Sequence, residues 1–170
     1  EGDLTLRVYC SVAVDPHAVA READLAPYED IRKRYPDDPL FKLGALSFIV
    51  DGTLPARSAA LLEPYAGSEE TGDVLVDPDE LNRAVRLADA AGWQIITHAT
   101  GDRAVRMALT AYAHASRSNR LPSKGRRHRL EHLALVDTAD LPRLGPLGVT
   151  ASLRPSLVPS DEIRFEGLSK

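Results

Sequence analysis

The sequence predicts an α/β fold built on a parallel sheet, and three observations lead to this prediction. Five short strand-like runs alternate along the chain with amphipathic patterns of helical period, which is the order of βαβ units. The chain has 170 residues, of which 44% are hydrophobic and 27% charged, the composition of a globular protein with one core. Five strands fit an open sheet or rather more than half of an eight-stranded barrel, whereas a complete (β/α)8 barrel needs roughly 250 residues.

The expected strands are short runs of mostly apolar residues that lie between polar, turn-forming segments. They cover residues 4–14, 45–50, 93–98, 129–133 and 149–153. Right-handed crossovers between parallel neighbours would place the connecting helices on one side of a closing sheet. The sequence therefore predicts a sheet with helices packed along one face.

Helices are expected in the intervals between these strands, over residues 16–35, 77–92, 101–116 and 138–145. The second has Asp77 to cap its N-terminus, Pro78 at the first helical position and Gly92 to end it. The third is predicted to begin at Asp102, which we interpret as its N-cap. Residues 52–77, which follow the second strand, form a connection of a length that is uncommon and often functional.

Charge and cysteine content exclude several classes of partner. The net charge of −4, without a basic run, gives no reason to expect nucleic acid or an anionic membrane surface. Cys10 is the only cysteine, which excludes a disulfide framework and a thiolate metal cluster and fits a cytoplasmic protein. No apolar stretch approaches the ~20 residues of a membrane span, and no signal peptide is visible.

The two ends of the sequence predict that it is a piece of a longer chain. It begins at Glu1 without an initiator methionine and enters a strand-like run at once. It stops after "SDEIRFEGLSK" with no obvious closing element. We therefore expect residues 1–170 to be a single segment of one domain, truncated at both ends.

Two histidines stand at the ends of consecutive strand-like runs. His98 ends "QIITH" and His132 ends "HRLEH", about one βα unit further on. If the two strands are parallel neighbours, ~4.8 Å apart, both imidazoles emerge at the C-terminal edge of the sheet and could share one zinc ion. Ligands of α/β sheets and barrels bind at this edge. The alternative for either histidine is a polar strand-end residue that is hydrogen-bonded to a loop.

The remaining histidines are interpreted as structural. His128 lies at the wrong end of its strand, His114 falls inside a helix, and His17 stands at a helix start. Catalytic zinc takes three protein ligands and keeps an open position, and these histidines do not supply the third ligand. Glu131 alternates with His132 along the strand and is therefore expected to face the helices, paired with an arginine.

Four stretches in this order resemble amidohydrolase family 3, the YtcJ-like branch of the metal-dependent amidohydrolases. They are "VDGTLPARSAALLEPY", "THATGDRAV", "RHRLEHLALV" and "LGVTASLRPS". The resemblance runs from about Leu4 to Pro155 and covers only the central part of such a protein. It implies a partial (β/α)8 barrel of the TIM type and, in the parent enzyme, one or two divalent metal ions, expected to be zinc, at the C-terminal face.

The resemblance also implies roles for particular residues. His98 and His132 match two metal ligands of the family, and Arg57 is a candidate substrate-binding residue. The family's His-x-His pair and its late general-base aspartate have no counterpart in this chain, so no catalytic residue is assigned. Ser47 stands where the family often has a lysine whose carbamate bridges two metal ions, which places a lysine-bridged binuclear centre in doubt.

Two hypotheses of different class follow. In the first, the chain is a fragment of a metal-dependent hydrolase that uses activated water to cleave amide-type C–N bonds of a small molecule, and the fragment alone is inactive. In the alternative, it is a non-catalytic α/β module for binding or assembly. In either case exposed sheet edges favour a homo-oligomer. A nucleotide binder that uses the turn at Thr100–Asp102 is a weaker option, because no G-x-G-x-x-G or P-loop pattern is present.

Overall fold

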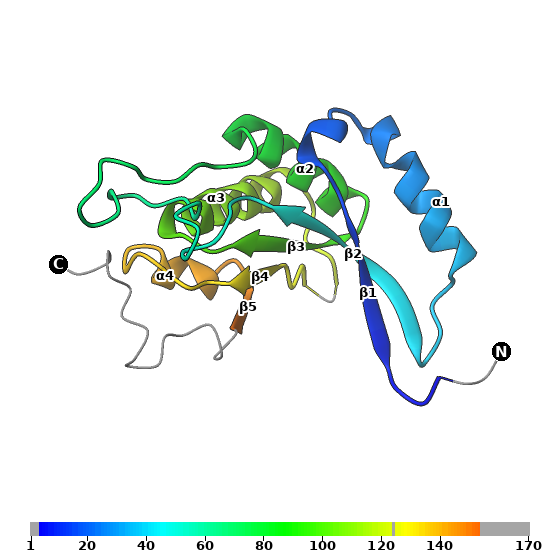
Figure 1. Cartoon of the computed structure of the whole chain (residues 1–170). Helices are drawn as coiled ribbons and strands as arrows, with labels where there is room; N and C mark the ends of the chain where they lie inside the picture. The colour runs from blue at the N-terminus through cyan, green and yellow to red at the C-terminus, as the bar shows by residue number, and fades with distance from the viewer. Residues whose placement is uncertain (1–3, 124, 154–170) are drawn as a thin grey trace.

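The computed structural model describes residues 4–123 and 125–153, and these contain one five-stranded sheet (Figure 1). The strands are β1 (Val8–Ala13), β2 (Phe41–Ile49), β3 (Gln94–Ala99), β4 (Arg129–His132) and β5 (Thr150–Leu153). Every neighbouring pair is parallel, and the strands lie side by side in their order along the chain. The five predicted parallel strands are confirmed, whereas positions 154 and 155 of the matched motif lie outside the described residues.

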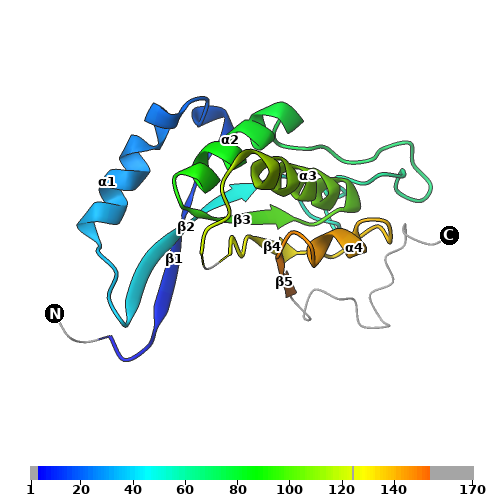
Figure 2. The same ribbon diagram turned by 180° about the vertical axis from the view of Figure 1, so that it is seen from behind.

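The helices are α1 (Ala26–Arg34), α2 (Pro78–Ala90), α3 (Asp102–Ser118) and α4 (Leu141–Leu144), with two 3-10 turns, η1 (Pro16–Ala18) and η2 (Glu22–Leu25). The two opposite views of Figures 1 and 2 show α2 and α3 lying against the same face of the sheet. None of the helices in the described part of the chain is long and apolar enough to cross a membrane.

The single helix expected over residues 16–35 is wrong. Arg21 is extended, with φ −147°, and this separates η1 from η2 and α1. The Asp24 carboxylate accepts the backbone N–H of Arg21 at 3.0 Å, which stabilises the break in the same way as a capping box. Pro27 then stands in the first turn of α1, where a missing N–H costs nothing. The helix expected at 138–145 also shortens, to α4 alone.

The predicted starts of α2 and α3 are confirmed, but the N-cap role predicted for Asp102 is wrong. Asp77 caps α2 by accepting the N–H groups of Asp79 and Glu80 at 2.8 and 3.3 Å. In α3 the N-cap residue is Gly101 and has no side chain to offer, while Asp102 is the first helical residue. The carboxylate of Asp102 is directed to a different segment of the chain, as described below.

The hydrophobic core lies between the sheet and the pair α2 and α3. Its fully buried members on the strands include Leu46, Phe48, Ile95 and Leu130, and those on the helices include Leu81, Val85, Leu109 and Tyr112. The hydroxyl of Tyr112 donates to Thr97 Oγ1 at 2.7 Å. Thr97 therefore faces the helices, and the alternation of side chains along a strand puts its neighbour His98 on the opposite face.

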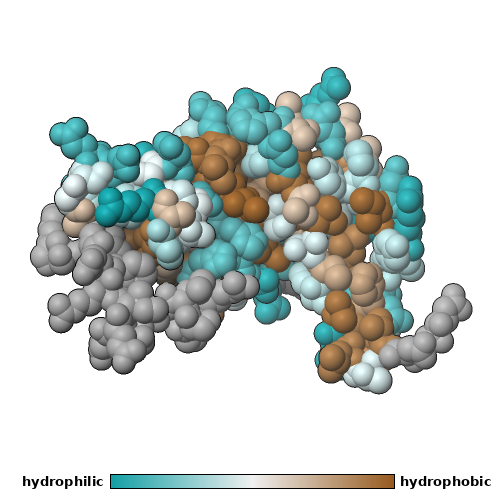
Figure 3. Space-filling model, in the orientation of Figure 1, coloured by the Kyte–Doolittle hydropathy of each residue, from teal (hydrophilic) through white to brown (hydrophobic). Residues whose placement is uncertain are grey.

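The opposite face of the sheet is covered by no helix of the described residues, and its middle is polar. Ser47, His98 and Glu131 lie on this face, whereas Ile49 presents an apolar side chain that is 52% exposed. Figure 3 shows hydrophobic side chains gathered towards the β1 and β2 side and hydrophilic ones nearer the centre. The candidate metal ligands therefore lie on an accessible face.

Candidate metal centre

His98 and His132 meet at the C-terminal edge of β3 and β4. His98 Nδ1 lies 3.1 Å from His132 Nε2, and the ring centroids are 5.2 Å apart. The strand register explains this meeting only in part, because His98 pairs with Glu131 and His132 pairs with Ala99. Simple alternation would place the His132 ring on the helix side of the sheet.

A left-handed backbone brings the His132 imidazole to the same side as His98. His132 has φ +78°, and Leu133 after it has φ +43°, conformations that residues with a Cβ rarely adopt. Each such residue costs about 1–3 kcal/mol, and strain of this kind concentrates at functional sites. The Leu133 N–H is held by Ala99 O at 3.1 Å, so the turn is fixed to the end of β3.

The spacing of the two imidazoles fits a shared divalent ion. Two ligand nitrogens at ~2.0–2.1 Å from a tetrahedral zinc lie about 3.3 Å apart, close to the 3.1 Å between His98 and His132. Neutral imidazole nitrogen is also a common zinc ligand. Within residues 4–123 and 125–153, no group of three or more His, Cys, Asp or Glu side chains could hold a metal ion. The described residues thus offer two candidate ligands.

Glu131 does not face the helices as expected. It is in register with His98, and its neighbour Leu130 is fully buried in the core on the helix side. The predicted arginine partner is Arg129, whose Nε lies 2.5 Å from Glu131 Oε1. The prediction for the orientation failed because it assumed that His132 continues the strand. The site face of β4 therefore carries an acidic and a basic side chain beside the histidine pair.

Strand β2 offers no ligand next to His98. Ile49 is the register partner of His98, and its side chain is a hydrocarbon. Ser47, at the position of the family's lysine, lies two residues before Ile49, and its hydroxyl donates to Val12 O at 3.4 Å. Ser47 is buried. Among the described residues, the candidate ligands therefore come from β3 and β4 alone.

Asp51 is a structural anchor that the sequence pattern did not reveal. Asp51 is 4% exposed, and its carboxylate accepts three backbone N–H groups. The donors are Ala60 at 2.9 Å, Thr100 at 2.9 Å and Gly101 at 2.8 Å. Burial raises the pKa of Asp51, although the three N–H donors act in the opposite direction. The end of β2 is thus joined to the turn between β3 and α3.

Asp102 makes a second link between the same segments. Its Oδ1 accepts the N–H of Leu62 at 2.9 Å, in the long connection predicted at residues 52–77. Gly101 permits the close approach, because a Cβ at this position would lie 2.1 Å from Ala60 O. In the sequence these two anchors appear only as the Asp-Gly and Gly-Asp dipeptides of the two motifs, which by themselves indicate turns. Together they hold the connection beside the C-terminal edge of the sheet.

Arg57 lies in this connection, away from the strands. It is exposed, has φ +51°, and donates its N–H to Leu54 O at 2.9 Å in a tight turn. Its role in substrate binding stays a prediction.

The other histidines have structural partners or lie elsewhere. His128 is buried at the opposite end of the sheet, where Nδ1 accepts the N–H of Ile95 at 3.1 Å and Nε2 lies 3.1 Å from Asp89. His17 pairs with Glu80 at 2.6 Å on the surface.

The fold and the site define the class of protein. Five sequential parallel strands, joined by helical connections and with side chains meeting at the C-terminal edge, form a partial (β/α)8 barrel of the TIM type. The model of the "Amidohydrolase family" matches residues 1–168. The chain belongs to this amidohydrolase family.

Two curated proteins are similar in sequence. The chain is 32% identical over 153 residues to "Putative amidohydrolase YtcJ" of Bacillus subtilis, a match that covers 89% of this chain and 26% of that protein. It is also 32% identical over 114 residues to "Protein LONG AFTER FAR-RED 3" of Arabidopsis thaliana, covering 66% of this chain and 19% of that protein. The chain thus spans about a quarter or less of the length of these relatives.

Two solved structures resemble the fold. One is a metal-dependent hydrolase of unknown character from Pyrococcus furiosus, with a TM-score of 0.70 and 27% identity over 89% of this chain and 29% of that one. The other is a similar hydrolase from Pyrococcus horikoshii, with a TM-score of 0.68 and 26% identity over 89% of this chain and 28% of that one. Both confirm the predicted barrel type, and both are described as metal-dependent hydrolases.

Proposed function

We propose that this chain forms part of a metal-dependent hydrolase that cleaves amide-type C–N bonds of a small molecule. The observation that carries the proposal is the 3.1 Å approach of His98 to His132 at the C-terminal edge of the sheet. His98 and His132 would hold a divalent ion, with zinc favoured by two imidazole ligands. When bound, such an ion polarises the scissile carbonyl and makes water nucleophilic near neutral pH.

The remaining residues of the site hold the two histidines in place and do not take part in the reaction themselves. The strained turn at His132 aims one ligand at the other, and the link from Asp51 to Thr100 fixes the segment that follows His98. Arg57 is proposed to contact substrate from the long connection. Two protein ligands are fewer than the three of catalytic zinc sites, and we propose that the 170 residues alone do not turn over. The lone thiol of Cys10 supports a reducing, cytoplasmic location.

An alternative is a non-catalytic module that binds other chains. The observation that favours it is the half-exposed Ile49 on the uncovered face, together with the unpaired outer edge of β1 in the described sheet. Such surfaces favour self-association. We propose a homo-oligomer of this chain on the same ground.

Zinc binding by the isolated chain tests the metal proposal. Equilibrium dialysis followed by metal analysis should detect zinc on the wild-type chain and none on His98→Ala or His132→Ala. His114→Ala removes an imidazole from α3, outside the site, and should bind as the wild type does. Equal zinc on His98→Ala and the wild type would refute the assignment. Hydrolysis of a simple amide by the isolated chain, lost in His98→Ala, would refute the proposed inactivity.

A further inference from the structure

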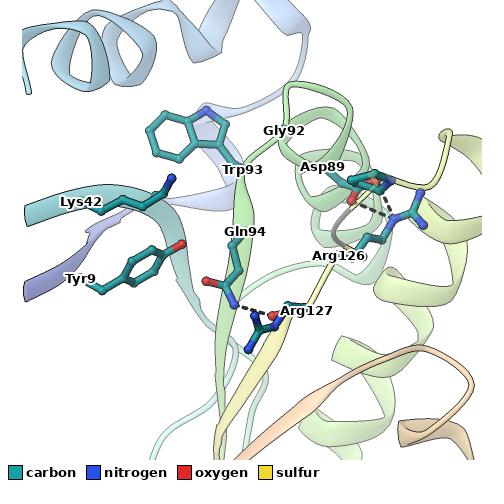
Figure 4. Close-up of a pocket in the computed structure, with 11 residues that line it drawn as sticks. Tyr9, Lys42, Asp89, Gly92, Trp93, Gln94, Arg126 and Arg127 are labelled. Atoms are coloured by element: carbon teal, nitrogen blue, oxygen red, sulfur yellow. Dashed lines mark hydrogen bonds and ion pairs between the residues drawn. The ribbon is translucent and has the colours of Figure 1, made fainter. Parts of the chain in front are cut away.

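A pocket lies at the end of the sheet opposite to the candidate metal centre (Figure 4). Its volume is about 520 Å³, within the ~300–1,000 Å³ of small-molecule sites. It is lined by residues at the N-terminal ends of three strands, Tyr9 on β1, Lys42 on β2 and Gln94 on β3, and by Arg127 just before β4. The pocket shares no lining residue with the His98–His132 site.

The charges around this pocket do not balance. Asp89 is the one carboxylate among its lining residues, and it is already taken by Arg126 Nε at 2.9 Å and by Asn119 Nδ2 at 2.8 Å. Lys42 is exposed and pairs with Asp37 outside the pocket. Arg127 forms no ion pair with any residue that the structure describes. The guanidinium of Arg127 thus leaves the pocket with an uncompensated positive charge.

Several polar groups converge on the space beside this charge. Figure 4 shows Tyr9 and Lys42 projecting from β1 and β2 towards Gln94, with Trp93 above them. The Gln94 Nε2 group donates to the backbone carbonyl of Arg127, which fixes the amide at the edge of the pocket. Burial raises the pKa of Tyr9, and the nearby charge of Asp37 acts in the same direction, whereas the positive charges of Arg129 and Arg127 act in the opposite direction. The hydroxyl, ammonium and guanidinium groups are donors that suit an anion.

We propose that this pocket binds a small oxyanion, a molecule carrying a carboxylate or phosphate group. Arg127 is the main partner, since a guanidinium can donate two parallel hydrogen bonds to such a group. Lys42, whose ammonium already pairs with Asp37, adds a weaker attraction from a different strand, and Tyr9 supplies a hydroxyl donor. The site lies beyond the proposed hydrolase function and does not depend on it.

Fluorescence of Trp93 gives a direct assay. Trp93 is the only tryptophan in the chain and forms part of the pocket wall. The 170-residue chain is titrated with inorganic phosphate and, separately, with succinate, each against sodium chloride of equal ionic strength. We expect a saturable change with at least one of the two anions and none with chloride. The anion that binds more tightly identifies the preferred group.

Matched variants locate the binding. Arg127→Ala should weaken it by about tenfold or more, the usual loss for a charge-assisted hydrogen bond, and Lys42→Met by a smaller factor. Arg117→Ala removes an exposed arginine of α3 outside the pocket, and His98→Ala tests the metal site; both should bind as the wild type does. If Arg127→Ala fails to fold by circular dichroism, Lys42→Met decides. The proposal would be overturned if phosphate and succinate both changed the Trp93 fluorescence no more than chloride does. It would also be overturned if Arg117→Ala lost as much affinity for the anion as the pocket variants do.

Discussion

We expect that replacing His132 by glycine leaves the fold more stable than replacing it by alanine. Both substitutions remove the imidazole and its contact with His98, so the side-chain losses cancel in the comparison. What remains is the backbone, which is left-handed at this residue, with φ +78°. Alanine at position 132 keeps the clash between its Cβ and the backbone, whereas glycine removes it.

The magnitude follows from two opposing terms. A left-handed conformation costs a residue with a Cβ about 1–2 kcal/mol. Glycine loses about 0.5–1 kcal/mol more than alanine in backbone entropy when the chain folds. The difference leaves His132→Gly more stable than His132→Ala by up to about 1.5 kcal/mol. At Glu131, which is extended in the same strand, only the entropic term applies, so glycine should be the worse substitution by about 0.5–1 kcal/mol.

Urea denaturation in the absence of metal measures both pairs. The urea midpoint should be higher for glycine than for alanine at position 132, and higher for alanine than for glycine at position 131. The reasoning fails if alanine is as stable as glycine at position 132, because the left-handed turn would then not be a property of the folded chain. A positive result would separate the cost of the His132 turn from the proposed metal binding, since neither variant retains the imidazole.

Three further predictions concern stability and assembly. Asp51→Ala should cost about 3 kcal/mol or more of folding free energy, because three buried N–H groups lose their acceptor. Since burial raises the folded pKa of Asp51, the wild type should also lose stability relative to Asp51→Asn as the pH rises above the ordinary carboxyl range. Parallel pH profiles of the two proteins in urea denaturation would contradict this. Tyr112→Phe should cost about 1–3 kcal/mol by leaving Thr97 Oγ1 without its donor, whereas Tyr28→Phe, a tyrosine for which the structure gives no hydrogen bond, should change the midpoint little. Light scattering should show the wild-type chain as an oligomer and Ile49→Asp as a smaller species; a wild-type monomer at high concentration would exclude the proposed association.

The parts of the fold that follow local rules could be predicted from the sequence. The apolar run before His98 and the cap at Asp77 are determined by neighbours in the chain, and both lie where the pattern placed them. The family resemblance is confirmed on the same strands. The meeting of His98 with His132 at one edge was also expected, because parallel strands end together.

The geometry of His132 could not be predicted, because it depends on contacts between segments. A non-glycine residue with a positive φ has no local signature, and this one is held by the bond from Leu133 to Ala99. The wrong orientation predicted for Glu131 has the same origin. It was inferred from His132, where the alternation of side chains along β4 no longer holds. Asp102 was assigned to its own helix for a similar reason: its partner, Leu62, is far away in sequence.

The anchored connection between β2 and α2 has a consequence for protein engineering. Asp51 and Asp102 hold residues 60 and 62 of this connection by hydrogen bonds, and the Tyr65 hydroxyl donates to Ala59 O at 2.9 Å. Beyond Tyr65, residues 66–70 are mostly exposed. A randomised library confined to these five positions would therefore vary the rim of the barrel without loosening the strands beneath it. Insertions there should be tolerated in the same way.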